Sequence, residues 1–413
     1  MREARIARLR MVLVAGTIFL PLLVSCTTVA AVTKPRATSR VRTEIAELSG
    51  LHMVQGDAFG TSVAISDTTV IVGAPSAGQV FVFTKSSIGS WNHTEELSGS
   101  DNTTPFGNEF GFSGMFGTSV AISGTTVVVG APGYANAAGR AFVFANKSGS
   151  WQRVAELKGS DSVADDEFGS SVAISGSTIV VGEPLHAGSA GQAYVFARRA
   201  GSWLQVAELR GSDTVASDAF GYSVAVSGST LIVGAPSVGN LAGKAYVFTE
   251  TTAGWSQVAE LEEAHSVSYD GFGFSVAVSG GTLIVGAPGG VVQGLPGSAS
   301  TPGQAFVFAK STARWRQVAE LKQPGLSADA FGLSVAIASA ALIVGAPGNG
   351  KTNGRAFLFT EAGGVWRQES QLQGNDTVAA DAFGSSVAIS GTSVVVGAFR
   401  KAHYTGRAYL FGA

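Results

Sequence analysis

Residues 220–261 read FGYSVAVSGSTLIVGAPSVGNLAGKAYVFTETTAGWSQVAEL, and the architecture of the protein follows from this unit. It contains four short runs of strand-forming residues separated by turn residues, chiefly glycine and serine. The first run, 223–226, alternates valine with small residues, whereas the second, 231–233, is apolar throughout. The first pattern predicts a half-buried strand and the second a strand that is buried on both faces. The Ser-Gly pair between the two runs is typical of a tight hairpin turn, because glycine readily adopts the positive φ that such turns need.

The same unit occurs seven times along the chain. Each copy begins with Phe-Gly and reaches Gly-Ala-Pro or a variant of it about 14 residues later, and the first six copies end with a Trp-containing run, which closes on Ala-Glu-Leu in most of them. The third copy departs from Gly-Ala-Pro with Gly182-Glu183-Pro184, and the seventh departs from it with Gly397-Ala398-Phe399. A repeat of about 52 residues with four antiparallel strands predicts one blade of a β-propeller. The phenylalanines of the seven Phe-Gly pairs are Phe59, Phe116, Phe168, Phe220, Phe272, Phe331 and Phe383.

The two ends of the chain predict how the ring closes. The seventh unit stops after its third strand, at residues 409–411. The missing fourth strand, with its Ala-Glu-Leu ending, occurs instead at residues 41–48. Pairing these segments would complete the last blade and remove the open sheet edges. We therefore expect an all-β, seven-bladed propeller of four-stranded antiparallel blades over 41–413. The structural alternative, a β-solenoid, has shorter repeats and parallel strands and needs no such exchange.

Composition excludes several other classes of protein. The 413 residues exceed the roughly 250–300 that one hydrophobic core supports, so a repeat array or several domains are required. The 55 glycines disfavour an all-helical fold, because glycine weakens helices. A net charge of −2 provides no field that would attract nucleic acid, so we expect no such partner. The single cysteine excludes an internal disulfide and a cysteine-based zinc site.

The N-terminus has the features of an export signal. Four arginines precede an apolar run at 11–24, which is shorter than the roughly 20 residues of a membrane-spanning helix. The run ends at Cys26 in Leu-Val-Ser-Cys, which resembles the lipobox of bacterial lipoproteins and implies lipidation of Cys26. Residues 1–26 are then a signal peptide and 27–40 a flexible tether, with the membrane reached through the lipid anchor only. A soluble secreted protein and a retained membrane anchor are the alternatives.

The Phe-Gly and Gly-Ala-Pro pairs resemble the FG-GAP repeat, which forms the blades of integrin α-chain propellers and occurs in many bacterial surface proteins. The resemblance covers 41–413 and implies a seven-bladed propeller with an extracellular binding or adhesion role. Integrin-type blades often carry an Asp-x-Asp-x-Asp-Gly calcium loop between their first two strands. Here that turn holds at most one carboxylate, as in Ser66-Asp67, whereas calcium takes 6–8 oxygen ligands. We therefore expect no calcium, and no other metal or cofactor.

Candidate ligand-binding residues gather in the loops that one face of a propeller presents. Both long insertions, 98–115 and 289–302, fall there. They are either binding loops or the result of sequence drift that the fold tolerates. The face also collects carboxylates, including an aspartate two residues before most Phe-Gly pairs. Such aspartates either attract a ligand or cap backbone N–H groups of the turn. The candidate ligand-facing residues are Asp101, Glu109, Asp166, Glu183, His186, Asp218, Asp270 and His403.

The sequence contains no recognised catalytic motif: no Gly-x-Ser-x-Gly, His-Glu-x-x-His or P-loop lysine is present. We therefore expect a non-enzymatic, exported and surface-anchored propeller that binds an extracellular protein or carbohydrate through its loop-rich face. One alternative is a glycan-acting enzyme, which needs only two carboxylates about 5–10 Å apart. Glu183, which replaces the alanine of Gly-Ala-Pro, is its best candidate, followed by Glu109. Another alternative is a structural scaffold of the cell envelope.

Overall fold

The computed structural model describes residues 42–99, 114–263, 268–289, 302–312, 314–323, 329–348, 350 and 352–412. The proposed signal peptide and tether, most of the insertions 98–115 and 289–302, and the candidates Cys26, Asp101 and Glu109 lie outside these residues. Within the described part, none of the helices has the length and apolar character needed to cross a membrane.

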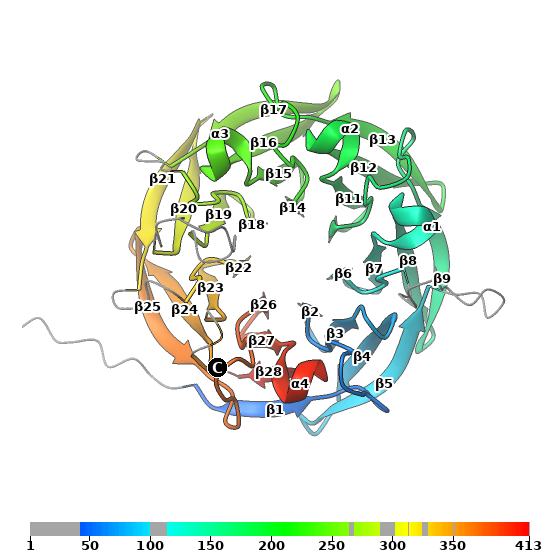
Figure 1. Ribbon diagram of the computed structural model, residues 1–413, viewed down its shortest axis with the longest axis vertical. Helices are drawn as coiled ribbons and strands as arrows, with labels where there is room; N and C mark the ends of the chain where they lie inside the picture. The colour runs from blue at the N-terminus through cyan, green and yellow to red at the C-terminus, as the bar shows by residue number, and fades with distance from the viewer. Residues whose placement is uncertain are drawn as a thin grey trace, which may run out of the picture. The chain divides into compact units, whose positions relative to one another are not determined.

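Seven four-stranded antiparallel sheets surround a central axis, which confirms the predicted β-propeller (Figure 1). The innermost strands of blades one to seven are β2 (Ser62–Ser66), β6 (Ser119–Ser123), β10 (Ser171–Ser175), β14 (Ser223–Ser227), β18 (Ser275–Ser279), β22 (Ser334–Ala338) and β26 (Ser386–Ser390). The second strands are β3 (Thr69–Ala74), β7 (Thr126–Ala131), β11 (Thr178–Glu183), β15 (Thr230–Ala235), β19 (Thr282–Ala287), β23 (Ala341–Ala346) and β27 (Ser393–Ala398).

The remaining strands complete the blades outward. The third strands are β4 (Gln79–Lys85), β8 (Arg140–Lys147), β12 (Gln192–Arg199), β16 (Lys244–Thr251), β20 (Gln304–Ser311), β24 (Arg355–Ala362) and β28 (Arg407–Phe411). The outer strands are β5 (Trp91–Ser98), β9 (Ser150–Leu157), β13 (Ser202–Leu209), β17 (Gly254–Leu261), β21 (Arg314–Leu321), β25 (Val365–Leu372) and β1 (Glu44–Leu48). Short helical turns join second to third strands: α1 (Tyr134–Ala137), α2 (His186–Ser189), α3 (Val238–Leu241) and α4 (Lys401–Tyr404).

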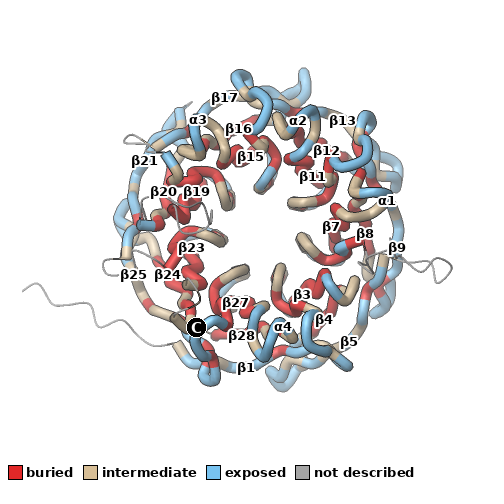
Figure 2. Tube along the Cα trace, in the orientation of Figure 1, coloured by how far each residue is buried: buried red, intermediate tan, exposed pale blue. Residues whose placement is uncertain are grey.

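The hydrophobic core is divided among the spaces between blades. One cluster of buried apolar side chains lies between each pair of neighbouring blades. The second strands are buried on both faces, as their apolar runs predict, and in Figure 2 the buried residues follow the middle of each blade while exposed residues follow its rim. In each blade the phenylalanine of Phe-Gly packs on a third-strand aromatic ring, as in Phe220–Tyr246 with centroids 5.4 Å apart.

Neighbouring blades are joined near the axis by a repeated hydrogen bond. The first serine of each innermost strand donates its Oγ proton to the carbonyl of the Phe-Gly glycine in the next blade, at 2.8 Å in all seven cases. The N–H of that glycine donates to the carbonyl of the glycine in the Gly-Ala-Pro position of its own blade, at 3.0–3.1 Å. Ser386 closes the ring by donating to Gly60. The Phe-Gly glycine therefore joins two blades at once.

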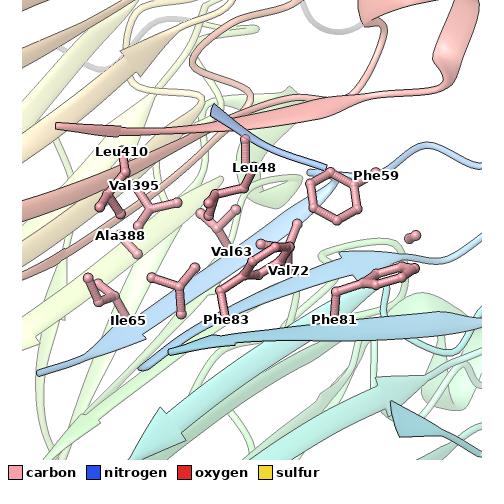
Figure 3. Packing of buried hydrophobic residues seen from close by; sticks show 13 residues of the cluster. Leu48, Phe59, Val63, Ile65, Val72, Phe81, Phe83, Ala388, Val395 and Leu410 are labelled. Atoms are coloured by element: carbon pink, nitrogen blue, oxygen red, sulfur yellow. The ribbon is translucent and has the colours of Figure 1, made fainter. Parts of the chain in front are cut away.

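The last blade is completed by the N-terminal strand, as predicted. β1 pairs antiparallel with β28, and the sheet has the order β1-β28-β27-β26. Leu48 of β1 is 3 % exposed and lies in the cluster between blades seven and one with Leu410 and Phe59 (Figure 3). Arg42 adds an ion pair with Glu369 at 3.0 Å. The chain ends are thus held together by apolar packing as well as by the strand ladder.

Replacing Leu48 by alanine should destabilise the whole propeller, because the ring then closes over a cavity. We expect a loss of about 2–5 kcal/mol in the free energy of unfolding, the usual range for a buried leucine. Thermal unfolding followed by circular dichroism measures the effect. Ile45→Ala is the matched control, since Ile45 lies in the same strand and is 49 % exposed. Equal losses in the two variants would contradict this account of closure.

Candidate functional site

Two sets of connections share one face of the propeller, which we call the loop face. These are the connections from second to third strands, which include α1–α4, and the connections from the outer strand of one blade to the next blade. Backbone hydrogen bonds join them directly: the N–H of Glu167 donates to Ala137 of α1, and the N–H of Ala219 donates to Ser189 of α2, both at 2.8 Å. The loop face is therefore a continuous surface built from neighbouring blades.

The aspartates that precede Phe-Gly have a structural role in the loop face. In four blades one carboxylate oxygen accepts a hydrogen bond from the backbone N–H three residues earlier, at 2.5–2.9 Å. These bonds hold the turn that leads into the next blade, which supports the capping interpretation. The four aspartates are Asp57, Asp166, Asp218 and Asp381.

In blade three the same turn joins a buried polar cluster. Glu183 ends β11 with no exposed surface, where the six other second strands carry alanine. Its Oε2 lies 2.6 Å from the hydroxyl of Tyr194 and 3.4 Å from Nδ1 of His186. That same Nδ1 lies 3.0 Å from Oδ2 of Asp166. The three predicted candidates Asp166, Glu183 and His186 therefore converge, with ligand atoms within 4.8 Å of one another.

The environment of Glu183 favours its neutral form. Burial raises the pKa of its carboxyl to about 7, and the charge of Asp166 adds to the increase, while Ser162, Tyr194 and His186 oppose it. Oε1 and the Ser162 hydroxyl are buried, and neither makes a hydrogen bond of ordinary geometry, although the hydroxyl is near enough to favour the carboxylate. Burial and the facing carboxylates raise the pKa of Tyr194, so its hydroxyl keeps its proton.

The Tyr194 hydroxyl has one proton to donate but lies within hydrogen-bond distance of two carboxyl groups. It lies 2.6 Å from Glu183 Oε2 and 2.7 Å from Oδ1 of Asp161. Because a phenol donates one hydrogen bond, it serves one carboxylate, and the other can bond to it only when that carboxyl itself holds a proton. Asp161 also lies 3.6 Å from Nε2 of His186. The imidazole is thus placed between Asp161 on one side and Asp166 and Glu183 on the other.

Blades four and seven contain a simpler version of this cluster. Tyr246 and Tyr409 donate to Asp213 and Asp376 at 2.7 and 2.8 Å, as Tyr194 does to Asp161. In blade seven Lys401 occupies the place of His186 and pairs with Asp376 at 3.0 Å and with Asp381 at 3.4 Å. An ammonium there offsets two carboxylates. Blade three has an imidazole in place of that ammonium and three carboxyl groups in place of two.

A pocket of about 600 Å³ opens on the loop face beside this cluster, chiefly over blades three and four, and reaches Thr118 of blade two. Pro184 and Leu185, which follow Glu183, form part of its wall. The carboxylate-bearing Glu167 and the aromatic Tyr222 contribute to the lining, and Tyr222 contacts the ring of Phe274 with centroids 4.8 Å apart. Its hydroxyl-bearing residues are Thr118, Ser170, Ser189, Ser217 and Ser237.

The other sequence-predicted residues lie elsewhere on the loop face. The carbonyl of Asp218 accepts a hydrogen bond from Ser237, which lines the pocket, at 3.3 Å. Asp270 is 4 % exposed in the turn before blade five, and His403 is exposed in α4 of blade seven. Among the described candidates, Asp166, Glu183 and His186 therefore converge in blade three, and Asp218, Asp270 and His403 lie in other blades.

Sequence reasoning missed Tyr194 and Tyr222. A signal for Tyr194 is present, because each Tyr–Asp pair in blades three, four and seven is separated by 33 residues. A repeat of this spacing identifies the aspartate as a partner of the tyrosine. For Tyr222 the signal is its departure from the serine or threonine that follows Phe-Gly in four other blades.

Asp270 belongs to a second acidic pair. Burial raises the pKa of Glu263 to about 7, with further increases from the charges of Asp270 and Glu320 and an opposing effect of Lys322. Between pH 4.5 and about 7 the folded protein therefore binds more protons at this site than the unfolded chain, and stability falls as the pH rises through that window.

Glu263→Gln should remove this pH dependence. We expect its Tm to exceed that of the wild type by an amount that grows from pH 4 to pH 8, because the amide carries no charge to desolvate. Differential scanning calorimetry at both pH values measures the difference. Glu262→Gln at the exposed neighbouring residue is the control. A difference that stays constant with pH would count against a buried, proton-binding Glu263.

The architecture defines the class of protein, a seven-bladed propeller built from Phe-Gly and Gly-Ala-Pro blades, with a pocket on its loop face. The model of the FG-GAP repeat matches the chain at residues 43–87, 91–144, 151–196, 203–248, 255–308, 315–359 and 366–411. The chain belongs to the FG-GAP repeat family. No protein of curated function matches it. Most matched segments begin at or near the outer strand of one blade and end near the third strand of the next blade. The chain as a whole has the same arrangement, because β1 is the outer strand of blade seven and β28 is its third strand.

Proposed function

We propose that the protein is an exported, surface-anchored binding protein that recognises a carbohydrate through the pocket over blades three and four. Membership of the FG-GAP family and the propeller fold are consistent with a binding or adhesion role. The observation that carries the proposal is the pocket itself, which combines an aromatic side chain, several hydroxyls and a carboxylate in about 600 Å³. That volume lies in the usual range of roughly 300–1,000 Å³ for small-molecule sites.

The chemistry of the lining favours a sugar. A pyranose ring has an apolar face that packs on an aromatic side chain, here Tyr222, and hydroxyl groups that need hydrogen-bonding partners around its edge. Ser170, Ser189 and Ser217 provide such partners, and the Glu167 carboxylate is an acceptor. A protein ligand would more typically require a broader apolar surface at the centre of the contact.

The fold does not require the aromatic side chains at the pocket. The residue after Phe-Gly is serine or threonine in four blades and Tyr222, Phe274 or Leu333 in the other three. Since all seven blades adopt the same four-stranded structure, the position tolerates a small hydroxyl side chain. Tyr222 is the one of these three departures that lines the pocket, so its ring is available for a ligand and is not needed for the blade.

A hydrolytic role is less well supported than binding. Glu183, the best candidate for a catalytic acid, has no exposed surface and faces Tyr194, Asp166 and His186. A glycosidase needs two carboxyl groups that flank the scissile bond, so a buried carboxyl is poorly placed for that reaction. Export and lipid anchoring rest on the N-terminal sequence, with its arginines, apolar run and Cys26.

The experiment is a glycan array probed with the 413-residue chain and two matched tyrosine variants. Tyr222→Ser copies the residue of blades three and seven and should lower retention on the bound glycan at least tenfold. Tyr404→Ser copies Ser189 of blade three, makes the same chemical change on the same face in blade seven, and should leave retention unchanged.

Equal retention of the two variants would overturn the pocket as the binding site. Absence of any glycan ligand, together with capture of a defined surface protein, would replace the carbohydrate by a protein ligand. Cleavage of the arrayed glycan by the wild type would favour the enzymatic alternative.

A further inference from the structure

We propose that Asp166, Glu183 and His186 of blade three bind a divalent metal ion of the zinc type. The site lies next to the pocket on the loop face but is built from side chains that the carbohydrate proposal does not use. Its ligands come from three elements: the turn before Phe168, the end of β11 and the start of α2.

The spacing of the three side chains fits a small cation. Zinc lies about 2.0–2.2 Å from nitrogen and carboxylate oxygen ligands, so neighbouring ligands of a tetrahedral ion are roughly 3.3 Å apart. Nδ1 of His186 lies 3.0 Å from Oδ2 of Asp166 and 3.4 Å from Oε2 of Glu183. All three ligand atoms fall within 4.8 Å of one another. The side chains therefore need only small rotations to surround an ion.

The side chains around the cluster would orient the ligands. Nε2 of His186, the nitrogen that faces away from the ion, lies 3.6 Å from Oδ2 of Asp161. A carboxylate behind the histidine is the usual support of a zinc-bound imidazole. Tyr194 donates to Asp161 at 2.7 Å. If Glu183 binds the ion, the single phenol proton serves Asp161 alone, which resolves the competition between the two carboxylates.

The charge of the cluster calls for a cation. Glu183 is fully buried, and its Oε1 makes no hydrogen bond of ordinary geometry. Its Oε2 faces the Tyr194 hydroxyl, and in the ionised form this carboxylate places a second negative charge beside Asp166 in a buried site, which a bound cation would offset. In blade seven Lys401 offsets Asp376 and Asp381, whereas in blade three one imidazole faces Asp161, Asp166 and Glu183. Arg210 approaches Asp161 at 3.8 Å but is 57 % exposed, so it offsets little of the buried charge.

The ligand set favours zinc over calcium. Imidazole with carboxylates suits zinc and related transition metals, whereas calcium takes 6–8 oxygen ligands. The side chain of His186 is 11 % exposed and that of Asp166 is 7 % exposed, so these two ligands lie just beneath the loop face. The proposal departs from the expectation, drawn from the sequence, of a chain without metal. The expectation of no calcium was drawn from the turns between first and second strands, and this site lies beyond the second strand.

Isothermal titration calorimetry with ZnCl₂ tests the proposal on the 413-residue chain after treatment with EDTA. The wild type should bind one ion per chain at this site. Glu183→Ala restores the alanine of the other six blades, so it should fold, and it should weaken that binding at least tenfold. Asp166→Asn should weaken it similarly. Asp381→Asn, the same change in the equivalent turn of blade seven, should leave it intact.

A second readout separates binding from folding. Zinc should raise the Tm of the wild type and of Asp381→Asn but not that of Glu183→Ala. Binding of equal strength in Glu183→Ala and wild type would overturn the proposal, since the ion would then lie elsewhere. Absence of zinc binding by the folded wild type, or binding of CaCl₂ in preference to ZnCl₂, would also overturn it. Failure of this site leaves the glycan-array result unaffected, because Tyr222 is not a ligand.

Discussion

The propeller depends on the close approach of two glycines in neighbouring blades. The Phe-Gly glycine accepts a hydrogen bond from the serine of the preceding blade and donates one to the Gly-Ala-Pro glycine of its own blade. A Cβ on Gly234 would lie 1.9 Å from the carbonyl oxygen of Gly273, so no larger residue fits there without a shift of the backbone. Seven such contacts set the spacing of the innermost strands and let the ring close through Ser386 and Gly60.

This constraint explains where the sequence is free to vary. The residue after the Gly-Ala-Pro glycine ends the second strand at the loop face. It is alanine in six blades, where it packs with almost no exposed surface. In blade three Glu183 occupies that position without disturbing the sheet. This one change of residue type places a carboxylate next to Asp166, Tyr194 and His186, whose positions are set by the fold. A single residue that departs from the repeat thus gives blade three a chemical environment of its own.

Most of the fold could be predicted from the sequence, because a blade is specified by local patterns that recur at a fixed period. Closure by β1 was also predictable, since the Ala-Glu-Leu ending is displaced to the N-terminus. The site was predicted only as separate residues. Asp166 and His186 stand 20 residues apart, and their contact depends on how the connection before blade three folds against α2. The Tyr194–Asp161 pair spans 33 residues and begins in the connection before blade three, so only the recurrence of this spacing in blades four and seven reveals it.

Contact between blades, and not backbone dihedral preference, is the reason that the first position of Gly-Ala-Pro must be glycine. Thermal unfolding of Gly234→Ala and Gly228→Ala distinguishes these two causes. Gly228 has a φ of +55°, and no atom lies within 4 Å of the position that a Cβ would occupy there. Its replacement should therefore cost only about 1 kcal/mol through backbone strain. Gly234→Ala should abolish the cooperative transition or lower the Tm far more. A Gly234→Ala protein as stable as Gly228→Ala would contradict the account.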